Sequence, residues 1–408
     1  MKGRIWILNH YASLPDRPGG TRHYDVGRQL VRMGWDVTVF ASSFDHLIHR
    51  ETLPHGVTYD EQVHDGLKFV RVKTASYNRN NWRRVLDMLV YTVRVLRLTW
   101  TRQPPDVIIG SSVHLLAAWA GYVLSRHHGA RFLFEVRDLW PETLIGLGKM
   151  SRKHPFIIAL SHLERFLYAR AEYILFLLPR ASQYASGLGV DLSKCVYLPN
   201  GVDLEKFDSK NNSLPPDVDQ TLARIEASCI AVYTGTIGLV NHLDIMIDAA
   251  TSLWRNGVKS VHFLFVGEGP YKDALSRRVL DDALGNVTFI PAIAKEHIPA
   301  LLRRCQVGLL CTVPSPVYKY GISPNKLFDY MAAGIPTLVV GESEGSPLVE
   351  SGGGFQLEFG DVAGVARILM DVAKEPAIAQ ERGRRARAYV EANHSTVVLA
   401  RRLDSILA

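Results

Sequence analysis

This chain of 408 residues has only four cysteines, and their spacing excludes several kinds of site. Cys195, Cys229, Cys305 and Cys311 form no C-x-x-C pair, and none has a histidine nearby at the spacing of a zinc site. We therefore interpret them as reduced thiols of the core, and we expect no metal site.

Long apolar segments are lacking as well. Residues 173–178 are typical of the longest ones and fall far below the roughly 18 residues of a membrane-spanning helix. Residues 1–4, Met-Lys-Gly-Arg, lead directly into an expected strand, without the apolar block and cleavage site of a signal peptide. We therefore expect a cytoplasmic protein.

Several catalytic motifs are missing. The turn after the first expected strand, residues 9–13, reads Asn-His-Tyr-Ala-Ser and so lacks the G-x-G-x-x-G of dinucleotide-dependent dehydrogenases. No Cys/His set for covalent catalysis is present. Asp217 and Asp219 resemble the metal-binding Asp-x-Asp of another transferase fold, but they lie in a polar, proline-containing linker, and we interpret them as solvated.

Acidic residues are outnumbered by basic ones, which gives a formal net charge of +7 and a pI near 9.1. This balance favours acidic partners, such as phosphorylated ligands or anionic lipid. Nucleic acid is disfavoured, because the sequence lacks interleaved clusters of basic and aromatic residues.

Short apolar strands and amphipathic helices alternate along the chain, which indicates parallel sheets with helices on both faces. The chain is too long for one comfortable core, and the pattern restarts after the polar stretch 208–219. We predict an α/β protein with two doubly wound domains, residues 1–199 and 200–385, and a C-terminal helix, 386–408, that returns to the first domain. The expected strands are 4–8, 36–40, 67–72, 107–110, 131–135, 173–178, 195–198, 230–233, 261–266, 287–290, 307–310 and 337–340.

The most informative segment is 323–336. It reads as a Ser-Pro-Asn turn, a helix that carries Lys326 and Asp329, and a Gly-Ile-Pro stop before a buried strand. Three residues apart, Lys326 and Asp329 lie on one face near the helix start, where free N–H groups attract phosphate. Lys326 adds a full charge and Asp329 can accept hydrogen bonds from sugar hydroxyls, which suits a nucleotide diphosphate. For the pair alone, a surface salt bridge is an equally good interpretation.

The helical segment 82–102 is both basic and amphipathic, with tryptophans at positions 82 and 100. Such a helix can lie on an anionic membrane surface. An ordinary surface helix whose arginines face water explains the pattern equally well. The arginines are Arg83, Arg84, Arg94, Arg97 and Arg102.

Six segments in order along the whole chain resemble glycosyltransferase family 4, the retaining sugar transferases of the GT-B fold. They are similar above all to the branch typified by the N-acetyl-L-fucosamine transferases of surface-polysaccharide assembly. The segments are 18–20 (Pro-Gly-Gly), 135–142 (Glu-Val-Arg-Asp-Leu-Trp-Pro-Glu), 198–203 (Leu-Pro-Asn-Gly-Val-Asp), 233–238 (Tyr-Thr-Gly-Thr-Ile-Gly), 265–270 (Phe-Val-Gly-Glu-Gly-Pro) and 323–336. The resemblance implies two Rossmann-like domains that face each other across a cleft, with the nucleotide-sugar donor in the second and the acceptor in the first.

The resemblance also implies the residues of the donor site. Asp329 takes the place of the second of two family glutamates, which binds the ribose hydroxyls, whereas the first falls on Gly321 and its carboxylate is absent. The usual Arg and Lys that grip the diphosphate are missing too, and Lys326 is the natural substitute. The base is expected beside Ile293. The full set of expected donor-binding residues is Gly19, Gly20, Thr236, Gly238, Ile293, Ser323, Asn325, Lys326 and Asp329.

In the first domain, Arg137 and Asp138 stand where many family members have His-Asp beside the transferred sugar. Arg137 stays protonated, so it can orient sugar groups but cannot act as a base, and Asp138 can accept hydrogen bonds from hydroxyls. An internal ion pair is the alternative interpretation. Arg22 and Glu142 are expected on the acceptor side, and His23 is expected at the surface.

The implied enzyme is a retaining, metal-independent glycosyltransferase of the hexosyltransferase type, with Lys326, Arg137 and Asp138 as catalytic residues. Its donor is UDP-linked and carries an N-acetyl hexosamine or a deoxy sugar. Its acceptor is a saccharide or a lipid-linked saccharide of surface-glycan biosynthesis, reached at the inner face of the cytoplasmic membrane through the helix 82–102. We expect no cofactor, because Lys326 and backbone N–H groups replace Mg²⁺. The alternatives are a UDP-sugar 2-epimerase and a catalytically degenerate nucleotide-sugar-binding protein.

Overall fold

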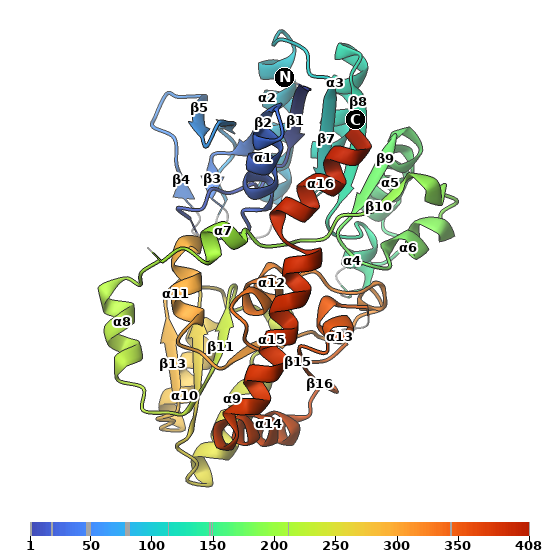
Figure 1. Cartoon of the computed structure of the whole chain (residues 1–408). Coiled ribbons are helices and arrows are strands. Elements are labelled where there is room, and N and C mark those ends of the chain that lie inside the picture. The colour runs from blue at the N-terminus through green and yellow to red at the C-terminus, as the bar shows by residue number, and fades with distance from the viewer. Residues whose placement is uncertain are drawn as a thin grey trace. The chain divides into compact units, whose positions relative to one another are not determined.

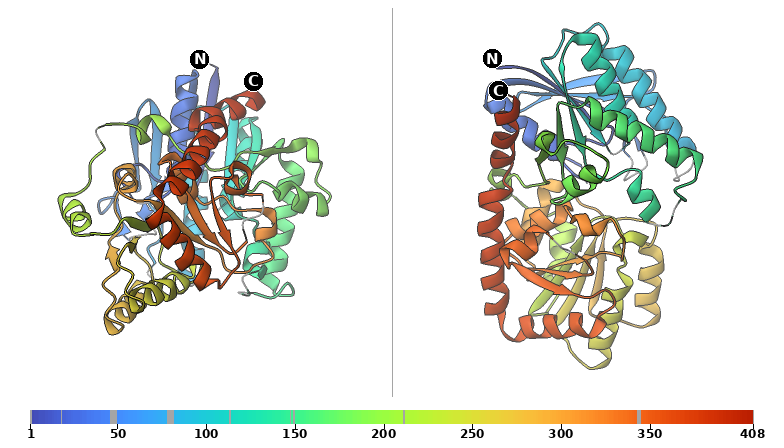
Figure 2. Two further views of the ribbon diagram at one scale, coloured as in Figure 1. Left: turned by 60° about the horizontal axis from the view of Figure 1, so that its bottom comes forward. Right: turned by 90° about the vertical axis from the view of Figure 1, so that its right-hand side faces the viewer.

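The computed structural model describes residues 2–17, 19–45, 50–77, 82–112, 114–146, 148, 150–210, 212–342 and 345–407. These residues form two compact units (Figure 1). Unit 1 comprises Met1–Leu14, Gly20–Pro199 and Thr396–Ala408, and unit 2 comprises Pro15–Gly19 and Asn200–Ser395. In both units helices cover the two faces of a sheet (Figure 2).

Unit 1 is built around a sheet that, in the described part of the chain, has eight strands in the order β10-β9-β8-β7-β1-β2-β6-β5. All neighbours pair in parallel except β5, which runs antiparallel to β6 at the edge. The strands are β1 Gly3–Leu8, β2 Trp35–Ser42, β5 Tyr59–His64, β6 Leu67–Val72, β7 Val107–Ser112, β8 Arg131–Val136, β9 Tyr173–Phe176 and β10 Cys195–Tyr197, and a separate antiparallel pair joins β3 Phe44–Asp45 to β4 Arg50–Glu51. The helices are α1 Arg22–Arg32, α2 Trp82–Thr99, α3 Leu115–His128, α4 Glu142–Gly146, α5 Pro155–Arg170, α6 Ala181–Gly187, η1 Leu192–Lys194 and α16 Thr396–Leu407.

The two faces of this sheet carry separate cores, because side chains alternate along each strand. In β1, Ile5 and Ile7 pack on the side of α1 and α16, whereas Trp6 and Leu8 pack on the side of α2 and α3. Apolar residues therefore follow one another without interruption in the central strands, as is typical of parallel sheets that are covered on both faces.

Unit 2 has the same architecture, with six parallel strands among its described residues in the order β13-β12-β11-β14-β15-β16. In β12, Phe263 and Phe265 pack on the side of α9 and α14, and Leu264 and Val266 pack on the opposite side with α12. The strands are β11 Cys229–Thr234, β12 Val261–Val266, β13 Val287–Ile290, β14 Val307–Cys311, β15 Thr337–Val340 and β16 Gly354–Leu357. The helices are α7 Leu204–Phe207, α8 Pro216–Ala223, η2 Leu239–Asn241, α9 Asp244–Arg255, α10 Lys272–Asp281, η3 Lys295–His297, α11 Ile298–Leu302, η4 Tyr318–Tyr320, α12 Asn325–Ala332, α13 Pro347–Ser351, α14 Val362–Lys374 and α15 Pro376–Asn393.

The C-terminal helical run is divided between the two units. The α15 helix packs in unit 2 and ends at Asn393, and α16 begins at Thr396 and packs in unit 1. At the break, the ring of His394 lies 4.9 Å from that of Phe328, and its carbonyl accepts a hydrogen bond from the N–H of Val202 at 3.1 Å. The chain therefore leaves unit 2 at a point that is fixed by packing and backbone bonding.

Two expectations about local structure are wrong. Residues 217–219 are not a linker, because they belong to the first turn of α8, where Asp219 forms an ion pair with Arg304 at 3.0 Å. The edge strand β5 was not expected, because its sequence Tyr-Asp-Glu-Gln-Val-His is mostly polar. In the part of the chain that the structure describes, no helix combines the length and the apolar character needed to cross a bilayer.

Candidate functional site

Lys326 lies in the first turn of α12, and its side chain reaches the carboxyl end of β11. Its Nζ sits 3.7 Å from the centroid of the Tyr233 ring, within the range of a cation–π interaction. Gly235 follows β11 with φ at 126°, and a Cβ atom at this position would come within 3.1 Å of the Lys326 Nζ. Both the backbone conformation and the space beside the ammonium group therefore favour glycine here.

The ammonium group of Lys326 is not neutralised by a neighbour. Among the described residues, no hydrogen bond or ion pair joins its Nζ to another side chain. Burial lowers the pKa of Lys326 to about 7, and the nearby charge of Asp329 opposes this shift only in part. Since desolvation disfavours the charged lysine, an incoming anion would stabilise it.

Asp329 binds a lysine that the sequence did not single out. The residue is buried, and both of its carboxylate oxygens lie 2.5 Å from Nζ of Lys295. Lys295 begins η3, after the loop that follows β13. The interpretation of Lys326 and Asp329 as an ordinary salt bridge is therefore wrong, since the carboxylate has taken another partner.

The loop before α12 is held by the Leu-Pro-Asn-Gly-Val-Asp segment. Asn200 donates its backbone N–H to Oγ of Ser323 at 3.1 Å and its Nδ2 to the carbonyl of Ser323 at 2.6 Å. Asn325 is the first residue of α12, and Pro324 before it provides no side-chain cap. Two segments more than 120 residues apart thus define the start of the helix that carries Lys326.

Two glycine-containing turns of unit 2 lie backbone against backbone. A Cβ atom on Gly267 would come within 1.9 Å of the Gly235 carbonyl oxygen, and one on Gly269 within 2.2 Å of the Ile237 oxygen. The N–H of Ile237 donates to the Glu268 carbonyl at 2.9 Å. Glycine in Val-Gly-Glu-Gly-Pro is therefore needed for this close approach, which shapes the loop beside Lys326.

The remaining donor-side predictions fall on loops. Thr236 is exposed, and its carbonyl accepts hydrogen bonds from the Tyr233 hydroxyl at 2.7 Å and from Asn241 Nδ2 at 2.8 Å. Gly238 precedes η2, and Ile293 is partly buried against the core after β13. Gly19 is exposed with φ at 122°, and Gly20 is half-buried. Pro18 lies outside the described residues.

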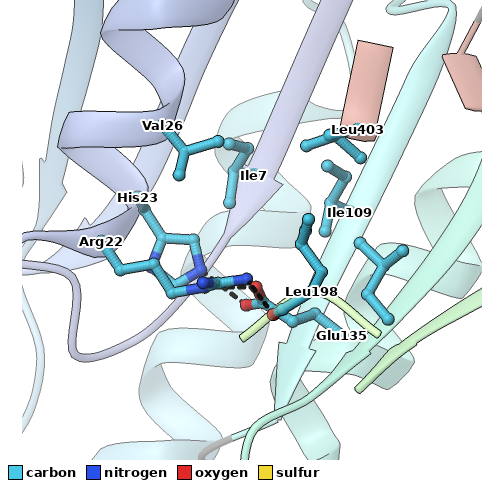
Figure 3. Close-up of a pocket in the computed structure, with 9 residues that line it drawn as sticks. Ile7, Arg22, His23, Val26, Ile109, Glu135, Leu198 and Leu403 are labelled. Carbon is cyan, nitrogen blue, oxygen red and sulfur yellow. Dashed lines mark hydrogen bonds and ion pairs between the residues drawn. The ribbon is translucent and has the colours of Figure 1, made fainter. Parts of the chain in front are cut away.

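The carboxyl edge of the unit 1 sheet holds a buried charge network. Glu135, near the end of β8, accepts hydrogen bonds from Arg22 Nε at 2.9 Å, His23 Nε2 at 2.6 Å and Ser111 Oγ at 2.6 Å. Figure 3 shows these charged groups at one end of a small void whose other walls are apolar. Burial by itself would raise the pKa of Glu135, but His23 and Arg22 hold it well below its usual range.

Two residues of this network, Arg22 and His23, were expected in other places, on the acceptor side and at the surface. Arg22 also donates to the carbonyls of Leu198, at 2.8 Å, and of Pro199. Its guanidinium is therefore bound inside unit 1, and the contact of Arg22 with an acceptor stays a prediction. The expectation that His23 lies at the surface is wrong, because its ring is buried against Glu135.

A second buried network fixes the segment after β1. His10 lies between the Tyr11 and Tyr91 rings, with its Nε2 2.9 Å from Asp87 and its Nδ1 2.8 Å from His114 Nε2. His114 Nδ1 accepts from a backbone N–H of α3, so a neutral His114 donates its Nε2–H to Nδ1 of His10. The contact of His10 with Asp87 is close but lacks the geometry of a hydrogen bond. Burial, followed by His10, lowers the pKa of His114 well below its usual value, which agrees with this neutral form.

The predicted sugar-contacting residues follow β8. Among the described residues no ion pair at contact distance joins Arg137 to Asp138, but the two charges attract each other, since Arg137 opposes the rise that burial causes in the pKa of Asp138. The alternative of an internal pair therefore stays open. Arg137 is half-buried, and its Nε is buried without a hydrogen-bond partner in the described structure. Asp138 is exposed, and Glu142 at the start of α4 pairs with Arg152 at 2.5 Å. In the same described part, no three His, Cys, Asp or Glu side chains gather as metal ligands.

Two family models match the chain, one in each half. The Glycosyl transferase 4-like domain matches residues 19–201, and Glycosyl transferases group 1 matches residues 228–375. With two Rossmann-like α/β units, the protein is an enzyme of the GT-B class. It belongs to the glycosyltransferases, as its motifs predicted, and this finding favours a transferase over a 2-epimerase.

Individual relatives agree with this assignment. WcaI of Escherichia coli (strain K12), a glycosyl transferase assigned to colanic acid biosynthesis, is 25% identical over 251 residues, 59% of each chain. The match thus spans less than two thirds of that relative. Among solved structures, sucrose-phosphate synthase from Thermosynechococcus elongatus is similar at a TM-score of 0.76 and 16% identity, covering 99% of this chain and 98% of that one. Anabaena HepE in complex with UDP-glucose has a TM-score of 0.68 at 14% identity, with 99% of both chains covered.

Proposed function

We propose that this glycosyltransferase moves a sugar from a nucleotide diphosphate donor to a glycan acceptor, with retention of the anomeric configuration. The main support is the ammonium group of Lys326, which lies at the carboxyl end of β11 without an anionic partner among the described residues. Ligands of doubly wound sheets bind at this edge. A diphosphate would supply the negative charge that the half-buried lysine lacks.

The proposed donor is a UDP sugar, and the proposed acceptor is a saccharide or a lipid-linked saccharide of a surface glycan. HepE, which shares the fold, was solved with UDP-glucose. WcaI is assigned to colanic acid biosynthesis. The Ser-Pro-Asn-Lys form of segment 323–326 favours an N-acetyl hexosamine or a deoxy sugar, because it resembles the N-acetyl-L-fucosamine transferase branch.

In the proposed reaction, the bond between the anomeric carbon and the diphosphate breaks and the acceptor oxygen attacks from the same face. A departing phosphate oxygen takes the acceptor proton. Lys326 and the backbone N–H groups that open α12 stabilise the charge on the leaving diphosphate. Arg137 and Asp138 orient sugar hydroxyls in the first unit. Metal ions have no role in this scheme, so activity should be unchanged by EDTA.

We also propose that α2 rests on an anionic membrane, where a lipid-linked acceptor resides. Apolar side chains on its outer face are exposed, including Trp82 at 67%, Leu89 at 46% and Trp100 at 45%. Exposed apolar residues in such numbers on one helix are unusual for a face that meets only water. Arg83 and Arg97 are exposed on the same helix and would contact anionic headgroups.

The remaining arginines of this segment are turned to other partners. Arg94 donates to the carbonyl of Lys73 at 2.6 Å, and Arg102 pairs with Glu61 at 3.0 Å. Arg84 donates to the Tyr11 hydroxyl at 3.4 Å. Arg83 and Arg97 are the exposed members of this set, and the proposal assigns the headgroup contact to them on the basis of that exposure.

The donor is tested by thermal unfolding with a panel of UDP, GDP, dTDP and ADP and their sugars. A ligand that binds the native state at 100 times its dissociation constant stabilises it by about 2.7 kcal/mol, so a true donor raises the melting temperature. We expect the largest rise with UDP compounds, and a smaller one in the Lys326→Ala variant. Equal melting temperatures with every nucleotide would contradict the proposal.

A further inference from the structure

Unit 2 places two lysines around a single buried carboxylate. Lys295 Nζ lies 2.5 Å from both oxygens of Asp329, although 34 residues separate the two in sequence. Lys326 is three residues before Asp329 on the same helix, yet its ammonium lies over the Tyr233 ring instead. The Asp329 carboxylate therefore pairs with Lys295, although Lys326 is its neighbour on the helix.

Helix geometry does not explain why Asp329 pairs with Lys295 and not with Lys326. Residues three apart on a helix are neighbours, so a lysine and an aspartate at this spacing normally attract each other. The side chain of Asp329 is 7% exposed and that of Lys295 is 23% exposed, so water screens their attraction only weakly. Because Lys295 already contacts both carboxylate oxygens, Lys326 would gain little by turning toward them.

We propose that Lys295 is a positioning residue of the donor site, which occupies Asp329 and thereby keeps the Lys326 ammonium free for a diphosphate. The identity of the anion rests on the proposed function. The competition between the two lysines rests on unit 2 alone, on the contacts of Lys295, Asp329, Lys326 and Tyr233.

The same contact leaves Asp329 able to serve a second partner. An ionised carboxylate offers about four lone-pair positions, and the Lys295 ammonium uses one on each oxygen. The others can accept hydrogen bonds from the hydroxyls of a ribose. Lys295 thus fixes the carboxylate in one orientation and cancels its charge, which would otherwise repel the neighbouring diphosphate.

Chemical labelling of Lys326 tests the competition directly, without any donor. Only the neutral amine is acylated, so the pH dependence of the reaction with acetic anhydride, followed by mass spectrometry, reports the protonation of Lys326. The groups that face this amine are Tyr233 from β11 and Asp329 from α12. In Lys295→Met, we expect Lys326 to turn to Asp329 and its labelling at pH 6 to slow about tenfold, as a rise of one pKa unit from about 7 requires at that pH.

The double variant separates this mechanism from other roles of Lys295. In Lys295→Met/Asp329→Asn no carboxylate remains to capture Lys326, so we expect labelling to return to the rate of the unaltered protein. Lys2→Met is the matched control, because Lys2 also contacts both oxygens of an aspartate, Asp404, at 2.8 Å, but in unit 1. Labelling of Lys326 that is the same in Lys295→Met as in the control would overturn the proposal.

Binding of inorganic pyrophosphate, measured by calorimetry, gives a second readout, since this probe has no ribose for Asp329 to contact. We expect Lys295→Met to weaken binding about tenfold and the double variant to recover it to within about threefold of the unaltered protein. If Lys295 held phosphate itself, the double variant would stay weak, and the proposal would be wrong. Absence of pyrophosphate and UDP binding in the unaltered protein would instead count against the proposed function, while the labelling result would still stand.

Discussion

The carboxyl edges of the two sheets use their charges in opposite ways. In unit 1, Arg22, His23 and Glu135 bind one another and leave no charge of the network unmatched. In unit 2, Lys295 and Asp329 bind each other, while Lys326 lies over Tyr233 and forms no ion pair within the part of the chain that the structure describes. Neighbouring groups satisfy the first arrangement, so we expect it to stabilise the fold. The second stays incomplete until a ligand supplies negative charge.

The difference also appears in the backbone. The segment after β1 is held by buried side chains, with Asn9 Nδ2 bonded to Ser111 Oγ at 3.2 Å and His10 paired with Asp87. The loop after β11 is instead shaped by glycines that meet backbone atoms directly. Side-chain contacts thus fix the edge of unit 1, whereas close backbone contacts at glycines fix the loop beside Lys326 in unit 2.

The largest effect is expected from breaking the charge network of unit 1. Replacing Arg22 with Met leaves the buried Glu135 carboxylate without its arginine, which costs about 3–5 kcal/mol when a buried pair is broken. We expect a lower melting temperature in calorimetry, with unchanged UDP affinity in the protein that still folds. Arg126→Met, at an exposed position of α3, is the control. Equal stability of the two variants would contradict the structural role given to Arg22.

Removing the charge of Lys326 at the sheet edge of unit 2 should lower turnover without affecting folding. Lys326→Ala removes the cation that stabilises the leaving diphosphate, and loss of one such group lowers kcat by about 10² to 10³. Steady-state kinetics with the best UDP sugar measures this effect. Lys319→Ala, on the exposed η4, should keep normal kinetics. Near-normal turnover of Lys326→Ala would contradict the role of Lys326 in stabilising the leaving diphosphate.

The pH dependence of binding sharpens the comparison further. The pKa of Lys326 is about 7 without ligand, so the lysine is charged below pH 7 and mostly neutral at pH 8.5. A diphosphate binds the charged form better, so its affinity should fall about tenfold between pH 6.5 and 8.5 while protons are taken up on binding. Calorimetry in two buffers of different ionisation enthalpy measures both. The Lys326→Ala variant should lose this pH dependence of the affinity. If the variant kept it, a group other than Lys326 would be responsible.

The smallest effect is expected at the outer face of α2. Each basic residue near an anionic surface contributes about 1 kcal/mol, so Arg83→Gln/Arg97→Gln should weaken binding to phosphatidylglycerol vesicles by roughly one to two orders of magnitude. Cosedimentation with vesicles measures this change. Arg126→Gln serves as the control. Unchanged vesicle binding of the double variant would reject the membrane contact. Turnover on soluble acceptors should be normal in this variant in either case.

The sequence predicted what depends on local spacing. The alternation of apolar segments predicted both sheets, and the segment 323–336 predicted a helix with Lys326 at the edge of the second one. It could not predict that Asp329 binds Lys295 or that Arg22 binds Glu135, because 34 and 113 residues separate these partners. Only the three-dimensional path of the chain brings them together. The strand β5 was missed for a different reason, since an edge strand needs few apolar residues.

The position of α16 has a consequence for how the protein is made. This helix supplies Leu399, Ala400, Leu403 and Leu407 to the core of unit 1, yet its codons follow those of the whole of unit 2. Domains usually fold in order as they leave the ribosome. Here the first unit to emerge waits with an open apolar face until the second has been translated, so a stalled or truncated nascent chain would expose that face to chaperones and to aggregation.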